Sequence, residues 1–394
     1  MKRLQHHVPQ TIAISGLAAL AVIMGIGRFA FTPILPMMQA DHGVTVAEGG
    51  WLASANYVGY LVGSLFAMRA HMRPRVAIRI GLVFIGVCTL AMGVEHHFGA
   101  WLILRAVPGF ASAWVMVFLS AWVLQQLAQA GRGDLSGTVY AGVGAGIVFA
   151  GLACLALSHI GASSDAAWIF LGVTTFVVTA LVWSVLGEES ASEATMPRSE
   201  DLSDRTPEFW RLVFCYGAFG LGYIIPATFL PIMAKQAIPE SGWFGWAWPA
   251  FGAAAMVSTL LAAKCAALLG QRKIWMLVNV VMALGVLVPI GLPGLYGIAV
   301  AALCVGGTFM VTTMAGIQEA RRVAGGNARV LIAAMTSAFA VGQIIGPILV
   351  SGLVHIRGGF SYALIASAIP LLLAACLLSV NQSSSVTRPV RLTR

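Results

Sequence analysis

The chain has 394 residues, of which 59% are hydrophobic and only 9% are charged, and its formal net charge is +9. Soluble globular proteins carry about 25% charged residues, so this composition excludes a water-soluble fold and indicates that lipid surrounds most of the chain. The long apolar runs also exclude a membrane barrel, whose strands alternate apolar and polar residues. The positive charge lies in short clusters between apolar runs, as expected for loops that set the orientation of membrane helices. We therefore expect no nucleic-acid partner.

The first apolar run, residues 11–39, is longer than the core of a signal peptide, which has about 7–15 residues. We interpret it as the first membrane helix, because about 20 mostly apolar residues cross a bilayer. Similar runs follow along the whole chain. The twelve predicted spans are residues 11–39, 48–68, 76–94, 99–128, 135–159, 166–186, 209–235, 243–268, 273–291, 294–318, 327–355 and 360–380.

The basic residues lie mostly on one side of this predicted bundle. With the N-terminus inside, nineteen of the 23 lysines and arginines fall on the cytoplasmic side, two on the opposite side and two within spans. Lysine and arginine are enriched in cytoplasmic loops. We therefore predict an all-α membrane protein with twelve spans and with both termini in the cytoplasm.

Residues 187–208 differ from the rest, since they are rich in glutamate, aspartate, serine and proline. This composition is typical of a solvated linker. It divides the chain into an N-terminal six-helix half, residues 1–186, and a C-terminal half, residues 209–394, that ends in a short basic tail.

The two predicted halves also share a sequence pattern. Residues 25–28 read Gly-Ile-Gly-Arg and residues 35–38 read Leu-Pro-Met-Met; 195 residues later, 220–223 read Gly-Leu-Gly-Tyr and 230–233 read Leu-Pro-Ile-Met. The constant offset indicates an internal duplication. Pairs of glycines at 59 and 63, 142 and 146, and 342 and 346 predict faces where helices pack closely.

Two six-helix halves around a polar linker resemble the major facilitator superfamily. The basic loop 69–75, the Arg105-Ala-Val-Pro-Gly109 pattern in the fourth span and the glycine-rich fifth span add to this resemblance, which covers nearly the whole chain. The run from Gly25 to Met38 is similar to the first helix of the YbfB/YjiJ-type branch, a bacterial group. The resemblance implies a multi-pass transporter of the bacterial inner membrane, and a central cavity lined by the first, fourth, seventh and tenth helices.

Arg28 is the most informative residue, because it lies deep within the first span. An arginine at bilayer depth costs at least about 2.5 kcal/mol, so we expect it to face the bundle interior or a wet cavity. It is a candidate anion-binding group, the alternative being an arginine that caps internal carbonyls. Arg105 in the fourth span has two equally weighted interpretations, substrate binding beside Arg28 and a structural or proton-coupling role.

Three further residues complete the candidate site. Tyr223 is the repeat mate of Arg28, and we expect it to line the same cavity rather than only pack between helices. Asn56 and Gln343 are polar groups within spans; Gln343 is predicted either to contact substrate or to bond a neighbouring helix.

Two other sets of residues are predicted to serve motion. Prolines break helical hydrogen bonding, so the candidate hinges are Pro33, Pro36, Pro226 and Pro231, unless they only shape the helices. The candidate cytoplasmic latch between the halves consists of Arg69, Arg73, Arg75 and Arg272.

All fourteen acidic residues lie in loops or near the ends of spans, so Arg28 has no evident counter-ion. This favours a secondary transporter that moves a small organic anion by alternating access, with a proton or a counter-anion as the coupled species. The alternative is an efflux pump for amphipathic or drug-like compounds, which the many aromatic and methionine residues suit. No phosphate-binding loop, clustered catalytic residues or metal-ligand spacing occurs, so we expect no enzyme activity, no cofactor and no metal site.

Overall fold

The computed structural model describes residues 8–186, 206–237, 245–324, 328–353 and 359–380. Most of the predicted linker 187–208 lies outside these residues; Glu208, its last residue, already belongs to a helix. The described elements are α1 (Pro9–Leu20), η1 (Ala21–Phe29), α2 (Phe31–His42), α3 (Val46–Arg69), α4 (Pro74–Met92), α5 (Phe98–Gln129), η2 (Gly133–Leu135), α6 (Ser136–His159), α7 (Ser164–Val182), α8 (Pro207–Ala237), α9 (Ala247–Leu269), α10 (Gln271–Gly291), α11 (Leu295–Ala324), α12 (Ala328–Leu353) and α13 (Gly359–Ser379).

The described part of the chain is all-helical, as predicted, and eleven helical stretches within it are long and apolar enough to cross a membrane. α1, η1 and α2 together form one of these stretches, 34 residues long. α3 does not meet the same criterion of composition. Its 24 residues include Glu48, Asn56, Ser64 and Arg69, which lower its mean hydropathy.

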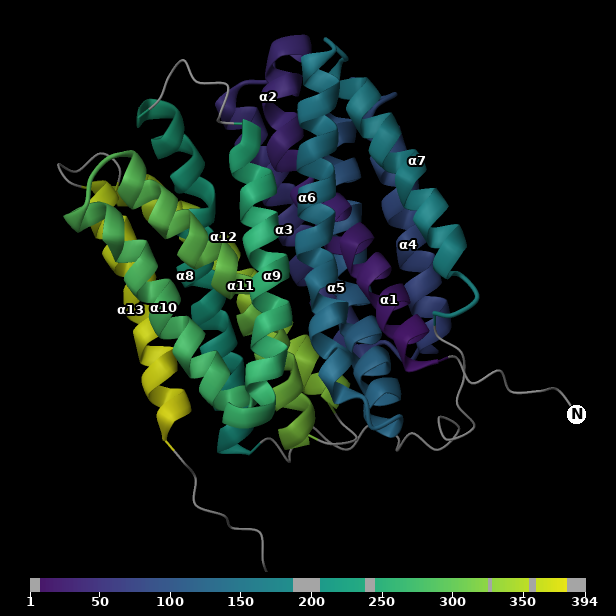
Figure 1. Cartoon of the computed structure of the whole chain (residues 1–394). Coiled ribbons are helices and arrows are strands. Elements are labelled where there is room, and N and C mark those ends of the chain that lie inside the picture. The colour runs from purple at the N-terminus through teal and green to yellow at the C-terminus, as the bar shows by residue number, and fades with distance from the viewer. Residues whose placement is uncertain (1–7, 187–205, 238–244, 325–327, 354–358, 381–394) are drawn as a thin grey trace, which may run out of the picture.

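The helices form two groups that lie side by side (Figure 1). The N-terminal group, α1–α7, meets the C-terminal group, α8–α13, where α6 packs against α9 and α3 packs against α12. α1 begins and α13 ends on the same side of the bundle in Figure 1, and we call this side the terminal end. The far end is the opposite side, where α2 ends.

Glycines bring particular helices close together in both groups. A Cβ atom on Gly25 of η1 would lie 2.5 Å from the Cα atom of Gly146 in α6, and one on Gly342 in α12 would lie 2.5 Å from the backbone nitrogen of Leu221 in α8. Real Cβ atoms do not approach so closely, so only glycine fits. The close-packing faces predicted at residues 59–63, 142–146 and 342–346 are confirmed. The first helix of each group therefore packs on a glycine face of its own group.

Standard capping chemistry sets the helix boundaries at the far end. α2 ends because Gly43 adopts a left-handed conformation, with φ of 67°, which glycine tolerates. α3 begins with a capping box, in which the Thr45 side chain accepts from the Glu48 backbone N–H and the Glu48 carboxylate accepts from the Thr45 N–H. α7 begins at a Ser163 cap, whose hydroxyl accepts from the Ala166 N–H at 3.2 Å.

Candidate functional site

The first membrane helix changes its hydrogen-bonding pattern at the level of Arg28. Residues Ala21–Phe29 form the π-helical segment η1 between α1 and α2, and Arg28 lies in its last turn. A π-helix bonds each N–H to the carbonyl five residues earlier, and such segments within α-helices are frequent at functional sites. Arg28 therefore lies on the widened, π-helical part of the first membrane helix.

Side chains of α3 and α5 bind carbonyl groups of η1. The Ser112 hydroxyl donates to the Ile23 carbonyl at 2.6 Å. The Asn56 amide nitrogen lies 3.0 Å from the Arg105 carbonyl and 3.5 Å from the Gly27 carbonyl. Buried carbonyls need donors, so these contacts stabilise the irregular segment. Asn56, a predicted substrate-binding residue, therefore bonds backbone atoms of two helices.

Arg105 also contacts the first membrane helix. It is 3% exposed, and its Nη2 lies 3.5 Å from the Arg28 carbonyl oxygen. Its guanidinium carbon lies 4.4 Å from the centre of the Phe31 ring, within the range of a cation–π contact. These contacts favour the structural interpretation of Arg105, as a residue that positions the backbone of Arg28.

The Arg28 side chain is buried, at 4% exposure, and it extends toward the C-terminal group. Its Nη2 donates to the Gln343 side-chain oxygen at 2.7 Å. Its guanidinium carbon lies 3.8 Å from the centre of the Tyr60 ring. Its Nε and Nη1 atoms have no hydrogen-bond acceptor among the described residues. Two nitrogen atoms of this buried cation, which together carry three N–H groups, thus have no acceptor among the described residues.

Gln343, on α12, is fully buried, and its bond to Arg28 joins the two helix groups across 315 residues of sequence. With its side-chain oxygen on Arg28, the Gln343 Nε2 atom also lacks an acceptor among the described residues. The unsatisfied atoms of this pair are all donors. A group of buried donors suits a ligand that carries acceptor oxygens, such as a carboxylate or a phosphate.

An aromatic cluster connects the two groups beside this pair. Tyr223 is 1% exposed and stacks on Phe309 of α11, with ring centres 5.3 Å apart. Phe309 also contacts Phe29, the residue after Arg28, at 6.0 Å, and Phe251 at 5.2 Å. Neither Phe29 nor Phe309 was predicted as a site residue, because phenylalanine is common in all apolar spans. The adjacency of Phe29 to Arg28 was the one signal that could have indicated it.

The predicted hinge prolines have different surroundings. Pro33 is half-buried and Pro36 is exposed, both in α2, whereas Pro226 is buried in α8. The side chain of Pro231 lies outside the described residues. Pro33 has no N–H to donate to the Phe29 carbonyl, so α2 begins with one helical bond fewer directly after η1. The hinge role of these prolines stays a prediction.

The predicted latch arginines do not form one cluster. Arg69, Arg73 and Arg75 are exposed at and after the end of α3. Arg272 forms ion pairs with Glu208 at 3.0 Å and with Glu319 at 3.8 Å, which join α10 to α8 and α11 inside the C-terminal group. The latch role stays a prediction.

Contacts between the two groups at the terminal end come from other residues. The Gln318 amide donates to the Ser136 hydroxyl at 3.0 Å. The Arg329 guanidinium carbon lies 5.3 Å from the centre of the Phe118 ring. Nearer the middle of the bundle, the hydroxyls of Ser64 and Ser337 lie 2.8 Å apart.

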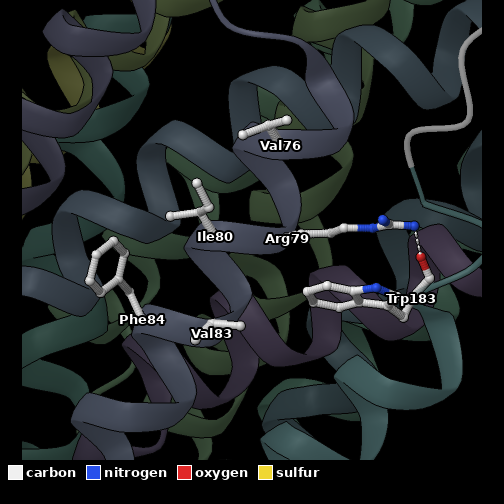
Figure 2. Close-up of a pocket in the computed structure, with 6 residues that line it drawn as sticks. All are labelled: Val76, Arg79, Ile80, Val83, Phe84 and Trp183. Carbon is white, nitrogen blue, oxygen red and sulfur yellow. Dashed lines mark hydrogen bonds between the residues drawn. The ribbon is translucent and has the colours of Figure 1, made fainter.

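A cavity of about 320 Å³ lies at the side of the bundle, away from Arg28. It is lined by Val76, Arg79, Ile80, Val83, Phe84 and Trp183. Figure 2 shows the Arg79 side chain extending over Trp183, to whose carbonyl oxygen it donates a hydrogen bond. Most of these apolar side chains are exposed on the outside of α4, so the cavity is not a site between the helix groups.

Two comparisons with known proteins agree on the kind of protein. A family model described as "Uncharacterised MFS-type transporter YbfB" matches residues 20–379. An "Uncharacterized MFS-type transporter YceJ" of Bacillus subtilis (strain 168) is 26% identical over 115 residues, which is 28% of this chain and 30% of that protein. The match thus spans less than a third of the curated relative.

Proposed function

Since the chain belongs to the YbfB-type family of MFS transporters, we propose that it is a secondary active transporter that moves a small organic anion across the bacterial inner membrane. The family is one of membrane transporters rather than enzymes. The observation that carries the anion proposal is the pairing of Arg28 with Gln343, which leaves three buried donor atoms without acceptors among the described residues.

The charge balance around these donors supports an anionic substrate. Within the described residues, no ion pair joins Arg28 or Arg105 to a carboxylate. Glu319 is buried, but it pairs with Arg322 and Arg272 near the end of α11. A cation deep in a low-dielectric interior is stabilised by an anion that reaches it. A cationic substrate would meet repulsion at Arg28.

The position of Arg28 between the groups supports alternating access. The two groups are proposed to be pseudo-symmetric halves that rock about the central site, exposing it to each side in turn. The substrate would bridge Arg28 of one half and Gln343 of the other, and rocking would make and break the contacts at Ser64–Ser337 and Gln318–Ser136. The coupled species is proposed to be a proton or a counter-anion.

We propose that α3 is the twelfth span, beside the eleven that satisfy the criterion of composition. Its 24 residues rise about 36 Å, enough to cross the hydrocarbon core of a bilayer. Its polar residues Asn56 and Ser64 are buried against other helices, where they avoid lipid. Twelve spans with both termini in the cytoplasm agree with the distribution of basic residues in the sequence.

The test is thermal unfolding of the purified full-length protein in neutral detergent and in a buffer free of carboxylate and phosphate. Carboxylates, phosphate esters and sulfonates are added singly to wild type, Arg28→Ala, Arg28→Lys and the control Arg132→Ala. The control removes a partly exposed arginine that pairs, among the described residues, with Asp134. A ligand at 100 times its Kd stabilises the folded state by about 2.7 kcal/mol. We expect one anion class to stabilise wild type and Arg132→Ala, but not Arg28→Ala.

Efflux of amphipathic compounds is the second candidate, because the cluster of Phe29, Tyr223, Phe309 and Phe251 offers a broad aromatic surface. This function predicts that neutral amphiphiles stabilise wild type and Arg28→Ala equally and that anions stabilise neither. That result would overturn the anion proposal and leave transport itself intact.

A further inference from the structure

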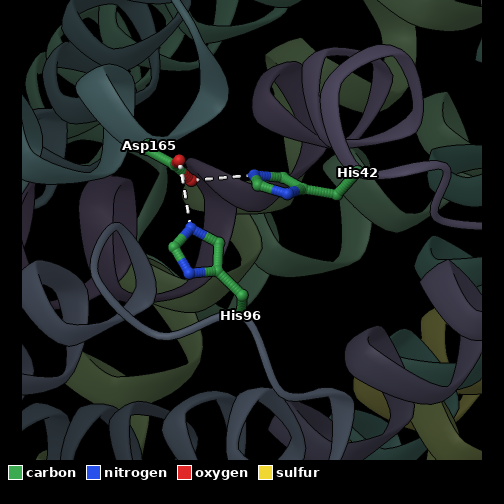
Figure 3. Close-up of side chains that lie close together, drawn as sticks. All are labelled: His42, His96 and Asp165. Carbon is green, nitrogen blue, oxygen red and sulfur yellow. Dashed lines mark hydrogen bonds and ion pairs between the residues drawn. The ribbon is translucent and has the colours of Figure 1, made fainter.

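Three metal-ligating side chains meet at the far end of the N-terminal group, apart from the proposed substrate site. His42 is the last residue of α2, His96 lies in the connection between α4 and α5, and Asp165 lies in the first turn of α7. Figure 3 shows both imidazole rings pointing at the carboxylate. The Nε2 atom of His42 lies 2.9 Å from Oδ1 of Asp165, and that of His96 lies 3.2 Å from Oδ2.

We propose that His42, His96 and Asp165 form a binding site for a transition-metal dication of the Zn²⁺ class. One ligand atom from each residue lies within 4.8 Å of the other two. Tetrahedral Zn²⁺ with bonds of about 2.0–2.1 Å places its ligand atoms about 3.3 Å apart. The two distances between a histidine nitrogen and the Asp165 carboxylate are close to this value, and no two of the ligand atoms are more than 4.8 Å apart. Two histidines and one carboxylate also match the ligand types that Zn²⁺ takes when a fourth position stays open for water.

Neighbouring groups hold the ligands in place before any metal binds. The Glu95 carboxylate accepts from the backbone N–H groups of His96 at 3.0 Å and His97 at 2.9 Å, which fixes the connection that carries His96. The Trp101 indole donates to the Glu95 carbonyl at 2.6 Å. The His42 ring packs edge-on against the Trp101 ring, with centres 5.5 Å apart. The imidazoles therefore need little reorganisation.

The α7 side of the cluster is fixed in the same way. The Asp41 carboxylate, one residue before His42, accepts from the Ser164 backbone N–H at 2.5 Å and so ties the end of α2 to the start of α7. Asp165 follows directly. The side chains remain accessible to solvent, with exposures of 20% for His42, 28% for Asp165 and 56% for His96. A metal ion can thus reach the site from water.

The local charge also favours a cation. Asp165 supplies one negative charge to the cluster, and Asp41 and Glu95 lie next to its ligands in sequence. A bound dication would link α2, α7 and the α4–α5 connection, and would brace the far end of the N-terminal group.

The test uses the full-length protein, with its affinity tag removed and its metals stripped by a chelator. Zn²⁺ is titrated by calorimetry into wild type, His42→Ala, His96→Ala and Asp165→Asn. The matched control is His159→Ala, which removes an exposed histidine from the end of α6 at the same end of the bundle. We expect one Zn²⁺ per wild-type chain, binding at least about tenfold weaker in each ligand variant, and an unchanged control.

Co²⁺ gives a second readout that does not depend on the variants folding. Tetrahedral Co²⁺ bound by wild type is expected to show visible absorption that excess Zn²⁺ removes. The proposal is overturned if wild type binds no Zn²⁺, or binds it no better than the double variant His42→Ala/His96→Ala. It is also overturned if His159→Ala loses as much affinity as the ligand variants. In either case the cluster only joins the helices by hydrogen bonds, in which two imidazoles bind one carboxylate.

Discussion

Arg28 and Tyr223 occupy corresponding positions in the two halves of the sequence, 195 residues apart, yet their surroundings differ. Arg28 lies in the last turn of a π-helical segment, two of whose carbonyls are bound by Ser112 and Asn56. Tyr223 lies in an α-helix, and the adjacent Gly222 carbonyl accepts from the Ser367 hydroxyl at 2.5 Å. Arg28 thus brings a charge to the contact between the two groups, whereas Tyr223 brings an aromatic ring. The two predicted repeats therefore differ at this position in both side chain and backbone.

The largest expected effect is that of Arg28→Gln. Each hydrogen bond to a charged group contributes about 1.5–3 kcal/mol, so losing two should weaken anion binding roughly 100-fold or more. Removing a buried cation that pairs with no carboxylate in the described part of the chain should leave the ligand-free protein as stable as wild type or more stable. Ligand titration and thermal unfolding measure the two effects. A variant that unfolds at lower temperature would show that Arg28 holds the fold.

Gln343→Glu should have the next largest effect, because it places a carboxylate where an amide oxygen lies 2.7 Å from Arg28. This internal anion should compete with the substrate, weakening its binding about tenfold or more, and should raise the unfolding temperature of the ligand-free protein. Gln343→Met is the matched control, expected to weaken binding without stabilising the fold. Equal unfolding temperatures for both variants would contradict a charge pair at this position.

Substitutions of Tyr223 should have a smaller effect. Aromatic stacking contributes about 0.5–1.5 kcal/mol, so Tyr223→Leu should weaken substrate binding about two- to tenfold. Tyr223→Phe keeps the ring that stacks on Phe309 and should bind like wild type. If Tyr223→Phe instead binds as poorly as Tyr223→Leu, the hydroxyl rather than the ring contacts the substrate. Binding titrations of the three proteins distinguish these outcomes.

Arg105 should contribute least to affinity, although it resembles Arg28 in charge and burial. Its contacts are with the Arg28 carbonyl and the Phe31 ring. Arg105→Met should therefore lower the free energy of unfolding by about 1–3 kcal/mol and leave the affinity of the folded protein within about twofold of wild type. Denaturant unfolding beside ligand titration tests this. A stable Arg105→Met protein without substrate binding would place both arginines in one site.

Much of the architecture could be predicted because lipid imposes a simple rule on long segments. Runs of about 20 apolar residues must be helical, since backbone groups find no partners in hydrocarbon. The same rule placed Arg28 deep within the first predicted span. In the structure Arg28 is buried, as are Tyr223 and Gln343. α3 is the instructive exception. Its polar residues serve contacts inside the bundle, so its composition alone falls short of the criterion for a span.

The finer features of the site could not be predicted, because they depend on contacts between distant segments. The π-helical segment has no local signal beyond its glycines, since Ser112 and Asn56, which bind its carbonyls, come from other helices. For the same reason the cluster of His42, His96 and Asp165 could not be predicted, because 123 residues of sequence separate the first of these residues from the last. Metal-ligand spacing is visible in a sequence only when the ligands are neighbours along the chain.

The hydrogen-bonding register of the π-helical segment also sets how the residues after it are rotated about the helix axis. If an N–H group in η1 bonded to the fourth preceding carbonyl instead of the fifth, the residues after it would rotate about the helix axis by roughly 100°, the angle between neighbouring residues. Gly25 holds the middle of the segment against Gly146, whereas Arg28 lies beyond that contact. A change of bonding register after Gly25 would therefore turn Arg28 and the residues of α2 about the helix axis, while Gly25 kept its contact with Gly146. The bond between Arg28 and Gln343 would then depend on the bonding register of η1.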